Sequence, residues 1–217
     1  AVPRLRDFNA QDLANTSWAF ATASHAAPAL LDAIATAAVP RLRDFKPQNL
    51  ANMAWAFATT GHAALALLDA IAAAAVPRLR DFKPQELANT AWAFATANHA
   101  APALLDAIAV AAVPRLSEFK PQDLAITVWA FAKAGHAAPG LLDAIAVAAV
   151  PQLRDFTPQG LANTAWAFAA ANHLAPVLFD SHVFVQLCAE RCLAPKDLSQ
   201  LHQWQLWQEE RGATWPP

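Results

Sequence analysis

One sequence segment recurs five times in this chain of 217 residues. The copies begin at Pro3, Pro40, Pro77, Pro114 and Pro151, a constant step of 37 residues. Five tryptophans keep the same step: Trp18, Trp55, Trp92, Trp129 and Trp166. In a repeat protein each copy packs mainly on its neighbours, so no unique pocket organises the chain. The repeat therefore predicts an array of equal structural units.

Each copy has the pattern of two helices joined by a short turn. In the third copy the first helix spans about residues 84–97 and opens with proline, which needs no N–H partner there. Glycine or asparagine, which tolerate a left-handed turn, follows this helix at Gly61, Asn98, Gly135 and Asn172. We therefore expect an all-α fold, an α-solenoid of five 37-residue helix-turn-helix repeats, followed by a degenerate sixth half-repeat and a C-terminal helix.

The second helix of each copy carries a proline within its apolar pattern. In the third copy one helical face holds Leu105, Ile108, Ala112, Leu116 and Phe119, although Pro114 falls among them. A proline inside a helix breaks or kinks it. Because the apolar period continues past the proline, we predict one kinked helix rather than two separate helices.

The pattern divides the chain into residues 1–187, the five-unit array, and residues 188–217, a degenerate half-repeat with a polar helix and a tail. Leu193, Pro195 and Leu198 fall 37 residues after Phe156, Pro158 and Leu161. At the other end, Ala1 and Val2 match the end of a copy. We therefore expect a piece of a longer protein, with an N-terminal edge covered by more of the same protein or by a partner.

The first helix of each copy has a core face and a variable face. Leu87, Ala91, Phe94 and Ala95 share the side that we expect to meet the second helix, and Trp92 lies at its border. The tryptophan ladder is interpreted as packing between successive first helices; the other hypothesis is a stacking platform for bases, which requires exposed rings.

The variable face is our candidate for reading RNA, because a modular reader keeps its frame and changes its reading residues. The RNA-facing candidates are Asp12, Asn15, Asn49, Asn52, Glu86, Asn89, Asp123 and Asn163. The structural alternative stays open: the acids complement helix dipoles and the asparagines bond between neighbouring repeats.

Basic residues recur near the start of the first helix. Lys46, Lys83 and Lys120 directly precede the proline that opens it, and Lys133 lies near the end of one such helix. Lysine beside free backbone N–H groups suits a phosphate, so these four are phosphate candidates. The alternative is a solvated face paired with Asp44, Asp81 and Glu118.

Charge and composition restrict the function. The net charge is −2, so any contact with a polyanion requires a one-sided basic patch. The chain carries no apolar run that is long enough to span a bilayer and no set of side chains that could converge for catalysis. Its loop histidines recur 37 residues apart, so they cannot share one metal. Cys188 and Cys192, with His182 and His202, do not match usual zinc spacings. We expect no enzyme, no metal and no cofactor.

The motif "PQELANTAWAFA", preceded by "RLRDF", resembles the octotricopeptide and heptatricopeptide repeat proteins of organelles and is similar to the repeats of FAST-kinase-like proteins. The segment "SQLHQWQLW" looks like the stretch before a RAP domain. This resemblance implies binding of single-stranded RNA or organellar rRNA in a mitochondrion or plastid, for transcript maturation, translation or ribosome assembly. The alternative is a protein-binding scaffold in a large organellar complex, such as a ribosome or a photosynthetic assembly.

Overall fold

The structure is a computed structural model that describes residues 4–180, 182–191 and 193–211. The described residues form helices and turns and contain no β-strand, which confirms the all-α fold. The predictions about the first residues of the chain, about Cys192 and about the tail lie outside the described residues. None of the helices described is long and apolar enough to cross a membrane.

The chain divides into two compact units, Ala1–Ala112 and Val113–Pro217. The helices of the first unit are η1 (Leu5–Asp7), α1 (Ala10–Thr22), α2 (Pro28–Ala38), η2 (Val39–Asp44), α3 (Pro47–Thr60), α4 (Leu65–Ala75), η3 (Val76–Asp81), α5 (Pro84–Thr96) and α6 (Pro102–Ala112). Those of the second are η4 (Val113–Glu118), α7 (Pro121–Lys133), α8 (Pro139–Ala149), η5 (Val150–Asp155), α9 (Pro158–Ala170), α10 (Pro176–Phe179), α11 (His182–Glu190) and α12 (Pro195–Glu210). The predicted single array over residues 1–187 stays a prediction.

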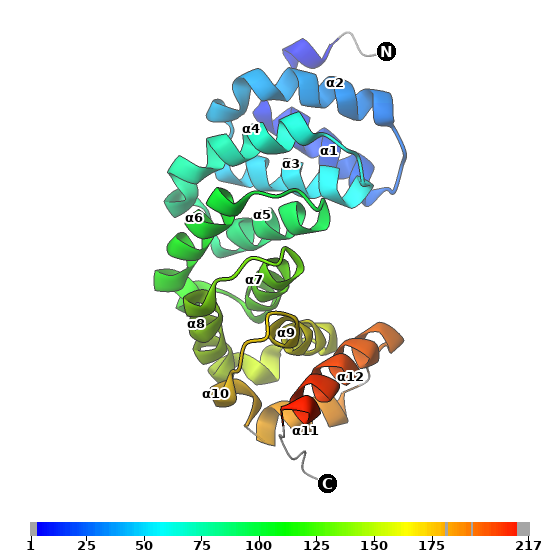
Figure 1. Cartoon of the computed structure of the whole chain (residues 1–217). Coiled ribbons are helices and arrows are strands. Elements are labelled where there is room, and N and C mark those ends of the chain that lie inside the picture. The colour runs from blue at the N-terminus through cyan, green and yellow to red at the C-terminus, as the bar shows by residue number, and fades with distance from the viewer. Residues whose placement is uncertain (1–3, 181, 192, 212–217) are drawn as a thin grey trace. The chain divides into compact units, whose positions relative to one another are not determined.

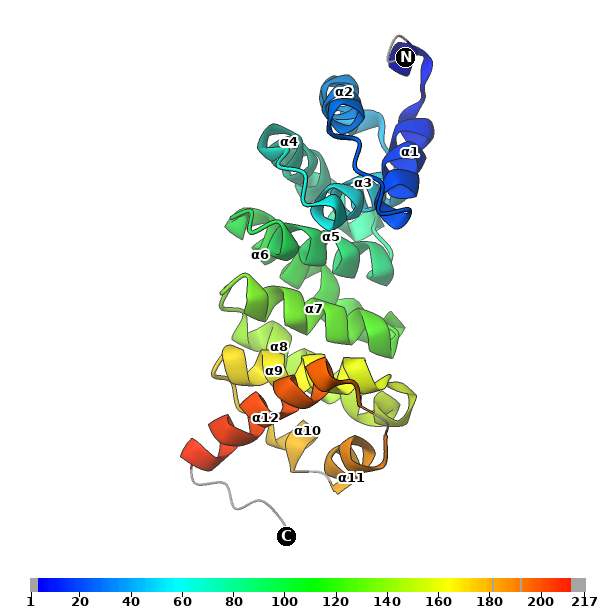
Figure 2. The same cartoon turned by 90° about the vertical axis from the view of Figure 1, so that its right-hand side faces the viewer.

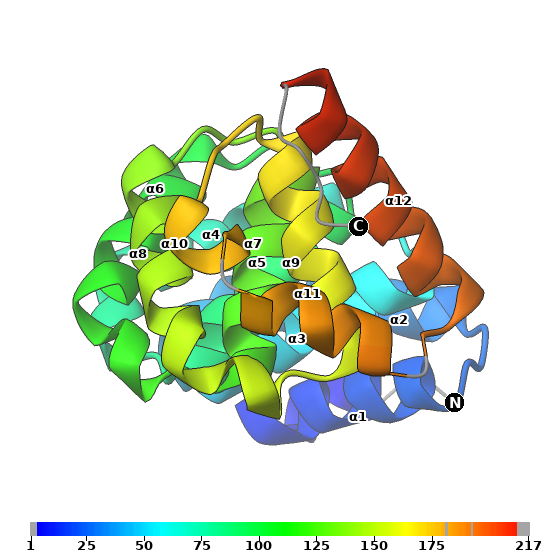
Figure 3. The same cartoon turned by 90° about the horizontal axis from the view of Figure 1, so that it is seen from below.

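Within each unit the first helices of the repeats, here called A helices, pack side by side. In the first unit α3 packs between α1 and α5, and the second helices α2, α4 and α6, called B helices, form the other row (Figures 1 and 2). In the second unit α9 packs between α7 and α12 (Figure 3). Neighbour-on-neighbour packing of this kind is the arrangement of an α-solenoid.

The predicted core of the A helix is confirmed in the third repeat. Leu87 and Ala91 are fully buried, and Phe94 and Ala95 are almost so. Small alanines let the helices approach closely, while one phenylalanine per repeat fills the space between rows; Phe57 and Phe94 in the first unit and Phe131 and Phe168 in the second are each at most 1% exposed. Large-to-small changes at such sites cost about 3–5 kcal/mol.

The turn after each A helix follows the predicted left-handed end. One residue within two positions of the helix end has positive φ in every repeat: Ser24, Gly61, Asn98, Gly135 and Asn172. The next residue, a histidine, donates its backbone N–H to the carbonyl of the helix phenylalanine, as from His62 to Phe57 at 3.2 Å. This bond closes the helix end and satisfies a carbonyl that has no partner inside the helix.

The structure corrects the expected kinked B helix. The α-helix ends at Ala75, and the 3₁₀ helix η3 follows directly from Val76. Pro77 has no N–H to continue the α-helical bonding, so the chain tightens into 3₁₀ geometry at the proline. The apolar face continues through this change, because Leu79 and Phe82 are both buried.

The C-terminal segment differs from the earlier repeats in the large side chains that it buries. The half-repeat and the polar helix are one helix, α12, and Leu198 is 53% exposed although its counterpart Leu161 is fully buried. Trp204, 2% exposed, fills the core instead and packs against Phe179 and Phe184 at ring distances of 5.1 and 5.6 Å. The 37-residue register nevertheless holds at the start of α12, because Pro195 opens this helix as Pro158 opens α9, and Asp197 is buried as Asp123 is in α7.

Candidate nucleic-acid interface

Arginines near the start of the 3₁₀ helices join successive repeats. Arg78 donates hydrogen bonds at 2.7 Å to the carbonyls of Arg43 and Phe45 in the preceding repeat. Arg41 donates to the carbonyl of Phe8 at 2.5 Å. The planar guanidinium presents two N–H donors in a fork, which fits two neighbouring carbonyls. Arg41 and Arg78 therefore belong to the framework rather than to a phosphate site.

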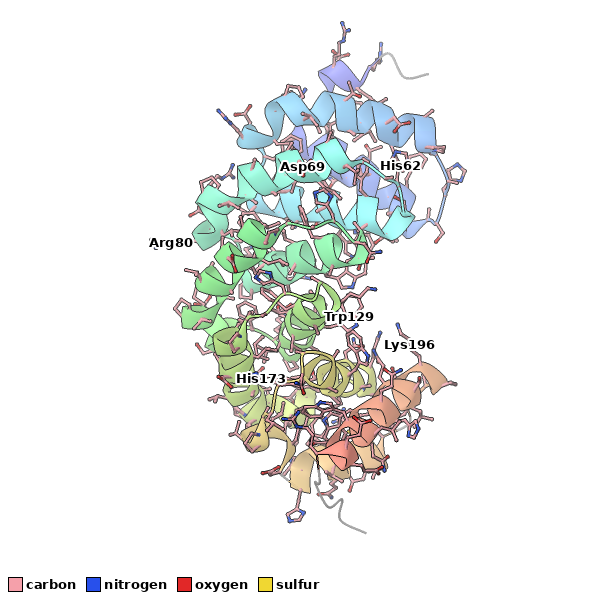
Figure 4. All side chains as sticks on the ribbon, in the orientation of Figure 1. His62, Asp69, Arg80, Trp129, His173 and Lys196 are labelled. Atoms are coloured by element: carbon pink, nitrogen blue, oxygen red, sulfur yellow. The ribbon has the colours of Figure 1, made fainter. Side chains whose placement is uncertain are left out.

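The loop histidines form a second link between repeats. His62 Nε2 lies 2.7 Å from Asp32 Oδ1, His99 Nε2 lies 2.8 Å from Asp69 Oδ1, and His173 Nε2 lies 2.8 Å from Asp143 Oδ1. His62, Asp69 and His173 are labelled in Figure 4. The backbone N–H of each histidine satisfies a helix-end carbonyl, whereas the ring contacts an aspartate of the preceding B helix.

The acidic candidates act at the start of the A helices. A carboxylate of Asp12, Glu86 or Asp123 accepts the N–H of the residue before the helix, as from Lys83 to Glu86 at 2.8 Å and from Lys120 to Asp123 at 3.1 Å. This contact stabilises the helix end and places a negative charge at its positive pole. Burial raises the pKa of Asp123 above its usual value, although Lys120 lowers it through a backbone hydrogen bond and its charge.

Two of the RNA-facing candidates are buried. Asn49 is 9% exposed and Asp123 is 6% exposed. A buried side chain offers no free edge to a base, so the structure corrects the prediction at these two positions. Asn49 lies on α3, which packs against α1, whereas the equivalent residue of α1, Asp12, has no preceding A helix among the described residues and is exposed.

The other asparagine candidates remain accessible. Asn15 is exposed, and Asn52, Asn89 and Asn163 are half-buried. Within the described residues, none of these four side chains makes a hydrogen bond. The hydrogen bonds between neighbouring repeats that the alternative hypothesis requires of these asparagines are therefore absent among the described residues. An amide with two donors and one acceptor unused is suited to a base edge.

The accessible residues of each A helix line up in a stripe of four positions. We call this the A-helix stripe; in α3 it comprises Gln48, Asn52, Trp55 and Thr59, and in α5 it comprises Gln85, Asn89, Trp92 and Thr96. These positions recur at steps of four, three and four residues, which keeps them on one helical face. All eight side chains are exposed or half-buried.

The tryptophan rings pair between neighbouring repeats. Trp55 and Trp92 stack with centroids 6.3 Å apart and planes at 28°, and Trp129 and Trp166 lie 6.3 Å apart at 37°. These contacts confirm packing between successive A helices, while the half-buried rings keep part of each face accessible. Trp129 is labelled on α7 in Figure 4. The stripe thus combines paired aromatic rings with free amides.

The four lysine candidates are all exposed. Lys83 and Lys120 lie beside the carboxylates of Glu86 and Asp123, which occupy the helix start. Lys46 is different, because α3 has no acid in its first turn and no side-chain cap. Lys133 ends α7, where a cation also complements the helix dipole. Lys46 therefore has the least competition for a phosphate.

One position of the stripe was not predicted from the sequence. The glutamine after each opening proline, as at Gln48 and Gln85, precedes the asparagine by one helical turn and is exposed. In α12 Lys196 takes the place of this glutamine and is exposed (Figure 4). Only the four-residue spacing from glutamine to asparagine could have indicated the shared face.

The cysteine and histidine residues give no metal site in the described part of the chain, where no group of three or more possible ligands comes together. Burial raises the pKa of the Cys188 thiol to about 12, although Arg191 lowers it slightly. A thiol with such a pKa is not a nucleophile at neutral pH.

Each unit is therefore built as a helical repeat protein of the α-solenoid class, with a polar and aromatic stripe along its A helices. No curated protein matches the chain. A family model described as RNA-editing substrate-binding complex 6 protein (RESC6) matches residues 1–203. The chain belongs to this family.

Proposed function

We propose that this chain binds single-stranded RNA through the A-helix stripes of its repeats. Family membership supports a role with RNA, because the family is described by an RNA-editing substrate-binding complex. Helical repeats that read one base per unit place two or three side chains of one helix on each base. In α3 and α5 the asparagine and the tryptophan one turn apart would hold the base edge and its face.

The observation that carries this proposal is the free amide of Asn52 and Asn89. Both side chains are half-buried and make no hydrogen bond within the described residues. A half-buried amide without a protein partner keeps its donors and its acceptor available to a ligand. Such a group beside stacked Trp55 and Trp92 is what a base-binding position requires.

The lysines supply the phosphate contacts in this proposal. Lys46 and Lys83 project from the starts of neighbouring A helices in the first unit. Each phosphate neutralised on a single strand contributes about 0.7 to the slope of log affinity against log salt. With a net charge of −2 on the whole chain, affinity depends on this local basic row rather than on bulk charge.

The setting that we propose is RNA maturation, translation or ribosome assembly in a mitochondrion or plastid. Kinship with octotricopeptide, heptatricopeptide and FAST-kinase-like proteins, which suggests this setting, rests on the repeat motif. We also propose that the chain acts by binding rather than by catalysis, with no cofactor.

A partner at the N-terminal edge is part of the same proposal. Trp18 is 47% exposed and Ala19 is exposed, whereas Ala56 and Ala93, the counterparts of Ala19, are fully buried by the preceding A helix. We expect the wild-type chain to self-associate through this edge at high concentration, and Trp18→Lys to reduce that association in sedimentation experiments. A wild-type chain that stays monomeric at every concentration would argue against a covered edge.

The test of RNA binding is fluorescence anisotropy with labelled single-stranded RNA at low salt. Asn52→Ala with Asn89→Ala should weaken binding by about 1–3 kcal/mol per lost base contact while the melting temperature holds. Thr36→Ala, on an exposed B-helix face, is the matched control and should change neither value. Lower stability of the asparagine variant, with no RNA affinity in the wild type, would favour the protein-binding scaffold.

A further inference from the structure

The B helices form a second kind of surface, distinct from the A-helix stripe. In the first unit a groove of about 620 Å³ lies between the end of α4 with η3 and the exposed side of α6. Val76, Pro77 and Val110 give it an apolar lining, and Asp106 and Arg80 contribute polar groups. Arg80 is labelled in Figure 4.

The second unit contains the same groove at positions 37 residues later. It has a volume of about 840 Å³ and is lined by Val113, Pro114 and Val147, with Asp143 among its polar groups. Val110 is 73% exposed and Val147 is 62% exposed. Single exposed valines are normal on a protein surface, but an apolar groove that recurs in both units points to a binding surface.

The charge of this surface selects the class of partner. Each of α2, α4, α6 and α8 carries one charged residue, an aspartate, and no lysine or arginine. In the second groove the side chain of Asp143 is 70% exposed although one of its oxygens contacts a histidine, and no cation lines this groove, whereas Arg80 lines the first. A carboxylate has further lone pairs, so its second oxygen can accept another hydrogen bond.

We propose that the B-helix grooves dock a protein partner, through an amphipathic helix with aliphatic side chains flanked by lysine or arginine. Aliphatic side chains would fill the valine- and proline-lined space, and the cations would meet the aspartates. In the second groove, where no lysine or arginine is among the lining residues, Asp143 would repel phosphates of RNA or of anionic lipids. The proposal does not depend on the A-helix stripe, so the two surfaces can be tested separately.

The first experiment measures anisotropy of two labelled peptides of about 18 residues, or five helical turns. Both peptides carry the same leucine and alanine face; lysine flanks it in one and glutamate in the other. We expect the whole chain to bind the lysine peptide at least about tenfold more tightly than the glutamate peptide. Equal affinities, or no binding of the lysine peptide at millimolar concentration, would overturn the proposal.

Variants then locate the bound peptide. The double variant Val110→Arg with Val147→Arg should weaken binding of the lysine peptide more than about tenfold. Both side chains are exposed, so the fold does not depend on them. Leu198→Arg, at an exposed site on α12, is the matched control and should leave affinity unchanged. If the double valine variant binds as well as wild type, the grooves are not the docking site.

The charge contribution has its own variant. Asp143→Asn keeps an oxygen for His173 and removes the negative charge. Binding of the lysine peptide should therefore be several-fold weaker at low salt and little changed at high salt, where salt screens the charge. A saturating concentration of single-stranded RNA should not displace the peptide. Displacement by RNA would place the peptide on the A-helix side and refute a separate protein-docking surface.

Discussion

Replacement of Arg78 tests whether the hydrogen bonds from an arginine to carbonyls of the preceding repeat, here called arginine joints, hold the repeats together. Its guanidinium bonds two carbonyls of the preceding repeat, one part-buried at Phe45 and one exposed at Arg43. A hydrogen bond to a charged group contributes about 1.5–3 kcal/mol when buried, and an exposed carbonyl regains water when its donor is lost. We assign about 1.5 kcal/mol to the first bond and about 0.5 kcal/mol to the second, a loss of about 2 kcal/mol in Arg78→Ala.

Urea denaturation followed by helical circular dichroism measures this loss. For a chain of this size about 2 kcal/mol corresponds to a melting temperature lower by about 4–8 °C. Arg78→Lys should recover only a small part, because an ammonium cannot bond two carbonyls in a fork. RNA affinity should stay within error of wild type, since this arginine belongs to the framework.

Arg43→Ala is the matched control, because the Arg43 side chain is exposed while its backbone carbonyl remains available to Arg78. We expect this variant to lose less than about 0.5 kcal/mol. Equal unfolding midpoints for Arg78→Ala and Arg43→Ala would refute the joint. Loss of RNA affinity without loss of stability in Arg78→Ala would instead place this residue among the phosphate contacts.

Three further predictions concern single groups. Because burial raises the folded pKa of Asp123, its carboxylate costs stability at neutral pH; Asp123→Asn should match or exceed wild type at pH 7 in urea unfolding, and this advantage should vanish as pH falls below the unfolded pKa. Cys188, with a pKa near 12, is thiolate in only about one molecule in ten thousand at pH 8, so iodoacetamide should modify it only in denaturant, as peptide mass spectrometry would detect; rapid labelling of the native chain would contradict its burial. His62→Ala should lower the free energy of unfolding by about 1 kcal/mol, because it removes the hydrogen bond to Asp32. An unchanged unfolding midpoint would show that this hydrogen bond does not contribute to stability.

Local sequence predicted the repeat and the helix ends because their causes are local. Gly61 and Asn98 tolerate the left-handed turn wherever they occur, and the positions of Leu87 and Phe94 follow from helical period alone. The transition to 3₁₀ geometry at Pro77 was harder, since an apolar period does not distinguish a kink from a tighter helix.

The candidate site was only partly predictable, because exposure depends on the neighbouring repeat. Asn49 and Asn52 lie one turn apart on α3, yet the first is buried and the second is half-buried. No property of a single helix separates them. The acceptors of Arg78 were equally hidden, since a backbone carbonyl leaves no trace in the side-chain pattern.

The main-chain acceptors of the arginine joints bear on how such an array can grow. Arg191 reaches the carbonyls of Phe156 and Arg154, the counterparts of those bound by Arg78, from a position two residues further along its repeat. A carbonyl is present whatever side chain evolves beside it, so each new copy of the segment needs only its own arginine. Tandem duplication of whole 37-residue segments can therefore lengthen the array without compensating changes in the older copies, and the same rule offers a direct way to shorten or extend it by gene synthesis.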